Sequence, residues 1–189
     1  MYRTLTLISA GLLMIIASGC STYYAPRYSV STENMGSLKS MKAGNKIRLG
    51  AFTSYKPGLQ TFGCRAAGPV GASQPFEEYI KRAMQSELQI SDVFDPNGPL
   101  ELSGHLTRIA MSSNIGVARW EVSMTFSSPG KESFTVDVVQ KTDSAWNGQQ
   151  ACFLVAQGFP GAVQELLLQT FNHPVFKSWA AKQASLQSR

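Results

Sequence analysis

The chain has 189 residues, of which 43% are hydrophobic and 15% charged, and its formal net charge is +5. This length is ordinary for one domain and sufficient to bury a single core, so we expect one domain. The excess positive charge is small, and no arginine-rich patch with interleaved aromatic residues appears, which argues against nucleic-acid binding. Most of the excess positive charge lies near the two ends of the chain. These charges either contact anionic lipid or glycan groups or simply keep flexible ends solvated.

The N-terminus has the pattern of a lipoprotein signal peptide. Arg3 supplies one positive charge, residues 5–17 form an apolar stretch too short to span a bilayer, and Gly19 directly precedes Cys20. Small residues followed at once by cysteine are typical of a lipobox; in an ordinary secretory signal the cysteine would be a coincidence. We predict that residues 1–19 are removed by cleavage between Gly19 and Cys20.

We expect the Cys20 sulfur to carry a diacylglyceryl group and its amine an acyl group. Each buried methylene contributes about 0.8 kcal/mol, so three acyl chains hold a protein almost permanently to a membrane. Ser21 stands where aspartate typically retains a lipoprotein in the inner membrane. The expected location is therefore the outer membrane, with the domain facing the periplasm. Loss of Arg3 leaves a mature net charge of about +4.

Two further cysteines, Cys64 and Cys152, lie within the predicted domain. Because exported compartments are oxidising, we expect a disulfide between them, with free thiols as the alternative. The bridge would close a loop of roughly ninety residues, which the chain-entropy model values at about 4.5 kcal/mol. We expect no metal, because His105 and His173 form no short ligand spacing with each other or with these cysteines. No cofactor is indicated.

The sequence divides into a leader, a linker, a domain and a tail. Residues 20–45 are polar without a sustained period, which predicts a lipidated N-terminus and a flexible tether. The tyrosine rings of this segment suit either a headgroup boundary or the surface of the domain. We place the single domain at residues 46–181 and a disordered tail at residues 182–189.

The first half of the domain predicts a strand, a loop and a helix. Residues 46–53 alternate apolar and polar side chains, as a half-buried strand does. Residues 55–72 contain repeated glycines and prolines and predict a long loop, which a bridge from Cys64 would pin. Apolar residues at helical spacing over residues 76–89 predict an amphipathic helix.

The second half predicts a meander and another helix. Residues 100–107, 118–127 and 134–138 alternate in the manner of three strands with one buried face. A second helix covers roughly residues 149–171, and Pro160 is expected to kink or divide it. This order predicts a two-layer α+β fold, with two helices on one face of a mostly antiparallel sheet of the meander and the N-terminal strand. The first strand could lie parallel to a neighbour through a right-handed crossover.

Several segments together resemble the YajG-type and related uncharacterised envelope lipoproteins. They are Ser31-Thr32-Glu33-Asn34, Cys64-Arg65-Ala66-Ala67-Gly68-Pro69-Val70, the helix from Phe76 to Leu88, Asn97-Gly98-Pro99-Leu100, Ala151-Cys152 and Pro174-Val175-Phe176. The resemblance covers most of the mature domain and implies a lipid-tethered periplasmic domain. It brings no established reaction with it. Pro160 departs from the uninterrupted helix expected in this group.

The sequence contains little that indicates catalysis. No Gly-x-Ser-x-Gly elbow exists, and His105 and His173 are expected at the surface, away from any nucleophile. Glu101 and Glu121 alternate onto the polar sides of two strands, so a cleft with paired carboxylates for glycan cleavage is one hypothesis. Exposed acids on a sheet usually contact water or cations, and arginines are near in the sequence. We therefore expect no enzyme.

Trp146 stands in a polar loop and is either a contact for a partner or a core residue. The first hypothesis for function is a nonenzymatic lipoprotein that binds another envelope component, through the polar sheet face or the Trp146 loop, as an accessory or assembly subunit. The second is a carrier or sensor of a small amphiphilic ligand, for which Met84, Met111 and Met124 would line an adaptable pocket.

Overall fold

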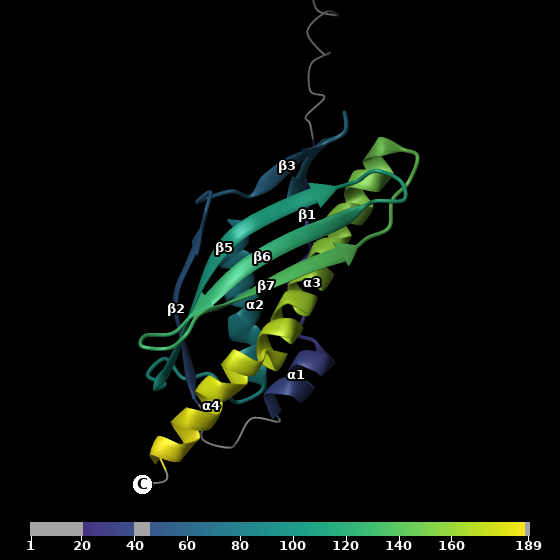
Figure 1. Ribbon diagram of the computed structural model, residues 1–189. Helices are drawn as coiled ribbons and strands as arrows, with labels where there is room; N and C mark the ends of the chain where they lie inside the picture. The colour runs from purple at the N-terminus through teal and green to yellow at the C-terminus, as the bar shows by residue number, and fades with distance from the viewer. Residues whose placement is uncertain (1–20, 40–45, 188–189) are drawn as a thin grey trace, which may run out of the picture.

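The computed structural model describes residues 21–39 and 46–187, with side chains described as far as residue 181. Figure 1 shows the arrangement of the helices and strands. In chain order they are β1 (Tyr23–Tyr24), α1 (Thr32–Lys39), β2 (Ile47–Ser54), β3 (Thr61–Cys64), β4 (Gly68–Gly71), α2 (Phe76–Ile90), β5 (Leu100–Ser112), β6 (Arg119–Ser127), β7 (Phe134–Lys141), α3 (Gly148–Asn172) and α4 (Pro174–Gln187).

The main sheet has the strand order β2-β5-β6-β7. Strands β5, β6 and β7 form an antiparallel meander, and β2 pairs with β5 in parallel. Because α2 connects β2 to the segment that leads into β5, these elements form the crossover that a parallel pair requires. The α+β fold, with a meander joined by an N-terminal strand, is confirmed.

Helices α2 and α3 cover one face of this sheet, and the other face is left open toward the viewer in Figure 1. The inward side chains form one core whose centre is aromatic: the ring centroids of Trp120 and Phe159 are 4.7 Å apart, and those of Phe76 and Phe159 5.2 Å. The Trp120 indole N–H donates to the Val155 carbonyl at 2.8 Å, so its polar atom is satisfied within the core.

A second sheet, with the order β1-β4-β3, corrects the prediction of an unstructured loop over residues 55–72. Strands β3 and β4 are an antiparallel hairpin of four residues each, and β1 pairs with β4 in parallel. Strands this short and rich in glycine show no alternation in the sequence. The hairpin is joined to the rest of the fold by β1, which pairs with β4, and by a disulfide from Cys64 to α3.

Helix α3 runs without a break through Pro160, which corrects the expected division. A proline inside a helix costs about 3 kcal/mol. Here Val155 and Phe159 before it and Val163 and Leu166 after it are all fully buried, so packing on the sheet outweighs that cost. Among the described residues, α3 is long and apolar enough to cross a membrane by length and composition, but half of the relevant window is buried within the fold.

Helix α4 follows α3 after His173 and continues to Gln187, so the segment predicted as a disordered tail is helical over most of its length. Its buried Phe176 and Trp179 pack against the aromatic side chains of Phe171 and Phe134. The structure thus has two helices, α1 and α4, beyond the two that the sequence predicts.

The Cys64 and Cys152 sulfurs form a disulfide, with the two Cα atoms 5.9 Å apart. Both cysteines are buried, at 2% and 0% exposure. The bond joins the end of β3 to the first turns of α3 and links residues 88 positions apart.

The first described segment, residues 21–39, is here called the N-terminal arm. It corrects the prediction of a flexible tether over residues 20–45, because it contains β1 and α1, and its Asn34 and Leu38 are buried at 0% and 1% exposure. Tyr23 and Tyr24 pair with Val70 and Gly71 of β4. The arm therefore belongs to the folded domain.

Glu87 of α2 holds the centre of the arm. Its carboxyl group is fully buried and accepts hydrogen bonds from the Tyr28 hydroxyl at 2.5 Å, the Ser31 N–H at 2.8 Å and the Asn34 side-chain amide at 3.0 Å. Burial, reinforced by the hydrogen bond to Glu87, raises the pKa of Tyr28 above its usual range, so this phenol stays protonated as the donor. The Tyr79 hydroxyl adds a bond of 2.8 Å to the Pro26 carbonyl.

Replacement of Glu87 by alanine is expected to lower the free energy of unfolding by about 3 kcal/mol, because buried donors lose their acceptor. Urea denaturation measures this loss, and hydrogen exchange should show faster exchange at the Ser31 amide. Glu78→Ala, at a partly buried glutamate of the same helix, is the control. Equal stability and equal exchange in the two variants would contradict the role of Glu87.

Removal of the disulfide by Cys64→Ala with Cys152→Ala is expected to lower the free energy of unfolding by about 4 kcal/mol, because the unfolded chain regains its loop freedom. The measurement is urea denaturation of the variant beside the oxidised protein. Trp146→Ala, at a side chain that is 90% exposed, serves as a control expected to stay within about 0.5 kcal/mol. A double variant with the same free energy of unfolding as the oxidised protein would show that the disulfide adds little to stability.

Candidate functional site

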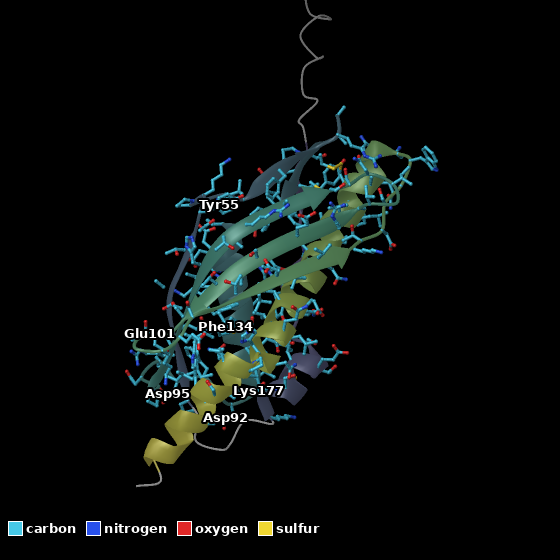
Figure 2. All side chains as sticks on the ribbon, viewed as in Figure 1. Tyr55, Asp92, Asp95, Glu101, Phe134 and Lys177 are labelled. Carbon is cyan, nitrogen blue, oxygen red and sulfur yellow. A yellow bond between two sulfur atoms is a disulfide. The ribbon has the colours of Figure 1, made fainter. Side chains whose placement is uncertain are left out.

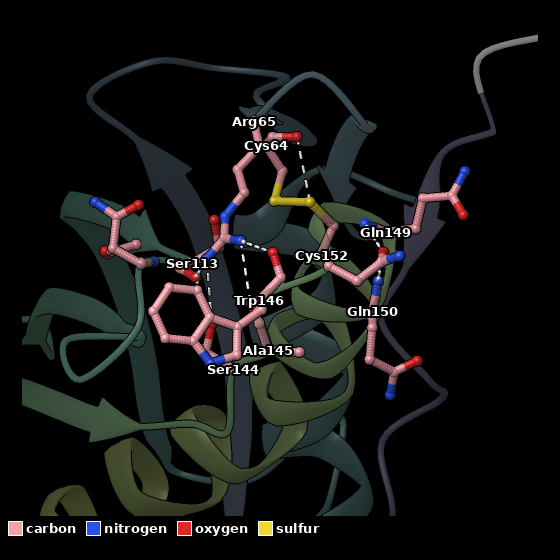
Figure 3. Close-up of a disulfide and its surroundings, with 12 residues drawn as sticks. Cys64, Arg65, Ser113, Ser144, Ala145, Trp146, Gln149, Gln150 and Cys152 are labelled. Carbon is pink, nitrogen blue, oxygen red and sulfur yellow. Dashed lines mark hydrogen bonds between the residues drawn. A yellow bond between two sulfur atoms is a disulfide. The ribbon is translucent and has the colours of Figure 1, made fainter.

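One end of the molecule gathers loops around the disulfide, and we call it the disulfide end. It comprises the β3–β4 turn (residues 64–68), the β5–β6 loop (113–118), the β7–α3 loop (142–147) and the first turns of α3. Figure 3 shows the disulfide between Cys64 and Cys152 with Arg65, Ser113 and Trp146 beside it. Segments that are far apart in the sequence therefore meet at one covalent link.

Arg65 ties these loops together. Its backbone has a φ of +48°, a left-handed conformation that non-glycine residues rarely adopt. Its guanidinium donates to the carbonyls of Ala145 at 3.0 Å and Trp146 at 3.4 Å, and also to the Ser113 carbonyl. Carbonyl and hydroxyl oxygens are its hydrogen-bond acceptors in the described part of the chain, so no carboxylate neutralises its charge there.

Trp146 projects from this end into solvent, with its ring directed away from the helices in Figure 3. Its side chain is 90% exposed, so the interpretation of Trp146 as a core residue is wrong. Its backbone is held on both sides, since Arg65 contacts its carbonyl and the Asn147 side chain caps α3 by accepting from the Gln149 and Gln150 N–H groups. The ring is therefore exposed on a fixed backbone.

Other large apolar side chains are exposed at the same end. Ile115 and Val117 stand in the β5–β6 loop at 46% and 51% exposure, and Phe153 stands in the first turns of α3 at 46%. Together with Trp146 they form what we call the apolar rim. Isolated exposed apolar residues are common, whereas a group of them at one end of a molecule is a candidate contact surface.

The open face of the main sheet is polar and rich in hydroxyl groups. Thr107 donates to Ser123 at 2.9 Å, and Thr125 and Thr135 are hydrogen-bonded at 2.8 Å across neighbouring strands. The arginines of this face are paired within it, whereas Asp137 of β7 is exposed there and forms no ion pair with a described residue. Arg48 binds Glu101 at 2.7 Å, while Arg108 and Arg119 both bind Glu121. We call this surface the polar sheet face.

The strand register rules out a catalytic pair of Glu101 and Glu121. Glu121 lies opposite Ala110 of β5, nine residues along the strand from Glu101, a separation of about 30 Å at the usual rise of a strand. Paired carboxylates in glycoside hydrolases lie within about 10 Å of each other. The Arg119 hydrogen bond and the nearby arginine charges lower the pKa of Glu121, which favours its ionised form in an ion pair.

The remaining candidates do not form a site. His105 is exposed and hydrogen-bonded to Thr53 at 2.8 Å, whereas His173 is half-buried and stacks on Phe134 at 4.2 Å between ring centroids. In the part of the chain that the structure describes, no three His, Cys, Asp or Glu residues gather as metal ligands would. Met84 and Met124 are fully buried within the core.

Gly19 and Cys20, the predicted cleavage and lipidation site, lie outside the described residues. Sequence reasoning singled out Trp146 and the two cysteines but attached no role to Arg65, Ile115, Val117 or Phe153. The one signal for Arg65 was its position directly after Cys64 in a glycine-rich segment. Nothing local to the sequence brings the apolar rim together, because its residues come from two separate loops and from helix α3.

The comparisons with known proteins support the fold. No protein-family model matches the chain, and no curated protein matches it in sequence. Among solved structures it is similar to the crystal structure of protein XCC0632 from Xanthomonas campestris, which is assigned to the family model DUF330, with a TM-score of 0.51 and 13% sequence identity. The match covers 88% of this chain and 99% of that one. At such identity the likeness concerns the fold alone.

Proposed function

We propose that the chain is a lipid-anchored lipoprotein of the bacterial envelope, of the YajG-type group, that serves as an accessory or assembly subunit by binding another envelope component. The observation that carries the proposal is the apolar N-terminal segment that ends in Ala17-Ser18-Gly19-Cys20. Cleavage before Cys20 would leave a protein whose first residue carries the acyl chains and whose second, Ser21, begins the described fold. The expected location is the outer membrane, with the domain in the periplasm.

The disulfide and the fold fit this proposal. A buried disulfide is typical of proteins that fold in an oxidising exported compartment, where a cytosolic chain would keep its thiols reduced. The solved structure with a similar fold also comes from a bacterium.

The polar sheet face supports binding of a protein partner. No described helix covers this face, which leaves a broad surface of paired strands between β2 and β7 (Figure 1). Its arginines are already matched by Glu101 and Glu121, so a partner that covers them would not leave these arginines without a counter-charge. Asp137, which has no ion-pair partner among the described residues, is available to a cation of the partner. Its hydroxyl pairs can exchange their mutual hydrogen bonds for bonds to a partner.

The same face supports the proposal of a role without catalysis. Glu101 and Glu121 lie too far apart to act together, and each is bound to arginine. The alternative of an amphiphile carrier has weak support, because Met84 and Met124 fill the core and the surface depressions are lined by other residues.

Radioactive palmitate should label the wild-type protein in bacterial cells, and Cys20→Ala should abolish both the label and the retention of the protein in the membrane fraction. The matched control is Cys64→Ala with Cys152→Ala, which removes the other two cysteine sulfurs and should keep the label. A labelled Cys20→Ala variant would overturn the anchor.

A photo-reactive amino acid at the exposed Thr135 of the polar sheet face should crosslink the protein to one envelope protein in intact cells. The same probe at the exposed Gln169 of α3 is the control and should give no such adduct. Mass spectrometry of the purified adducts identifies the partner. Adducts of equal yield from both positions, or from neither, would contradict binding through the polar sheet face.

A further inference from the structure

The described chain begins at the disulfide end. Gly68, at the start of β4, lies so close to the arm that an added Cβ would be 2.6 Å from the Ser21 carbonyl oxygen. Tyr23, which is two residues after Ser21, pairs with Val70 of β4. Gly68 closes the turn that contains Arg65, whose guanidinium holds the Trp146 carbonyl. Ser21 and Trp146 therefore adjoin the same turn, and Figure 1 shows β1 and the start of α3 at one end.

The arm allows little distance between this end and residue 20. Consecutive Cα atoms are about 3.8 Å apart, so Ser21 lies within one such step of Cys20. The arm is fixed to the domain by β1 and by the Glu87 hydrogen bonds. Ser21 is therefore held beside the β3–β4 turn, with no flexible segment between them. If Cys20 carries acyl chains, the disulfide end lies at the surface of the bilayer that holds them.

The apolar rim has the composition expected of a surface at that depth. Tryptophan is enriched at membrane interfaces, because its ring prefers the boundary between headgroups and hydrocarbon. Among the described large apolar residues, Trp146 is the most exposed. Ile115 and Val117 stand in the neighbouring β5–β6 loop, and Phe153 stands in the first turns of α3. Arg65 forms no ion pair with any described residue, so its positive charge at this end can attract anionic headgroups.

We propose that the disulfide end is a membrane-contact surface, with the Trp146 ring and the apolar rim placed in the headgroup region of the leaflet that holds the Cys20 acyl chains. This inference rests on the proposed lipid anchor. It adds that the domain is oriented, with the disulfide end on the bilayer and the opposite end, where Lys46 forms an ion pair with Asp92, directed away from it. The polar sheet face is then roughly perpendicular to the plane of the membrane.

Tryptophan fluorescence of the full protein in vesicles tests the contact. The protein is purified from membranes and reconstituted into vesicles of phosphatidylcholine and phosphatidylglycerol, with or without bromine on the upper acyl chain. Trp120 and Trp179 are buried at 0% and 3% exposure, so the difference between wild type and Trp146→Phe isolates the signal of Trp146. We expect that signal to shift to the blue and to lose most of its intensity in brominated vesicles.

A matched pair of variants tests the position of the surface. Ile115 on the rim and Ile90 at the end of α2 are similarly exposed, at 46% and 57%. Ile90 adjoins the turn that contains Asp92, and Figure 2 shows Asp92 at the end of the molecule opposite the disulfide end. Ile115→Ser should reduce the quenching of Trp146, and Ile90→Ser should leave it unchanged.

Intact mass of the same sample separates this inference from the lipid anchor. An acylated protein whose Trp146 keeps the emission of water-exposed tryptophan, without quenching, overturns the membrane contact and leaves the anchor standing. An unacylated protein whose Trp146 is quenched on added vesicles overturns the anchor and supports the contact surface. A protein that carries no acyl groups and whose Trp146 is not quenched overturns both proposals. Equal effects of Ile115→Ser and Ile90→Ser would also contradict the contact surface.

Discussion

The docking of the N-terminal arm on Glu87 is the interaction on which the arrangement of this protein depends. A carboxyl group at zero exposure is costly to bury unless donors reach it, and here a phenol, a backbone N–H and an amide do so. The arm and α2 therefore stabilise each other. As a result β1 lies beside β4, and the described part of the chain begins at the disulfide end.

At the disulfide end, two adjacent residues make a covalent link and a polar link to other segments. Cys64 binds α3 through its sulfur, and Arg65 holds the β7–α3 loop through its guanidinium. Both act on the backbone around Trp146 and leave the ring free. An exposed aromatic ring on a fixed backbone loses little conformational freedom when it makes a contact, which favours a binding surface over a flexible loop.

The elements that could be predicted have strong local periodicity. Helix α2 shows a stripe of apolar residues, and β6 alternates from Trp120 to Phe126, so their buried faces follow from the sequence. Strands β3 and β4 have four residues each and contain glycines, so no period can develop. Pro160 predicted a kink or a division, and the helix is not divided there, because buried contacts on both sides of the proline hold it together. The polar composition of the arm concealed Tyr28 and Asn34, whose acceptor lies more than fifty residues away.

The sequence by itself determined the class of the fold, the buried faces of α2 and of the meander, and the pattern of a lipobox before Ser21. Those properties depend on residues within a few positions of one another. Only the tertiary structure decided that the arm is docked, that Trp146 is exposed beside Arg65, and that register separates Glu101 from Glu121. These features depend on contacts between distant segments, whose geometry is set by packing of the whole domain and not by any local period.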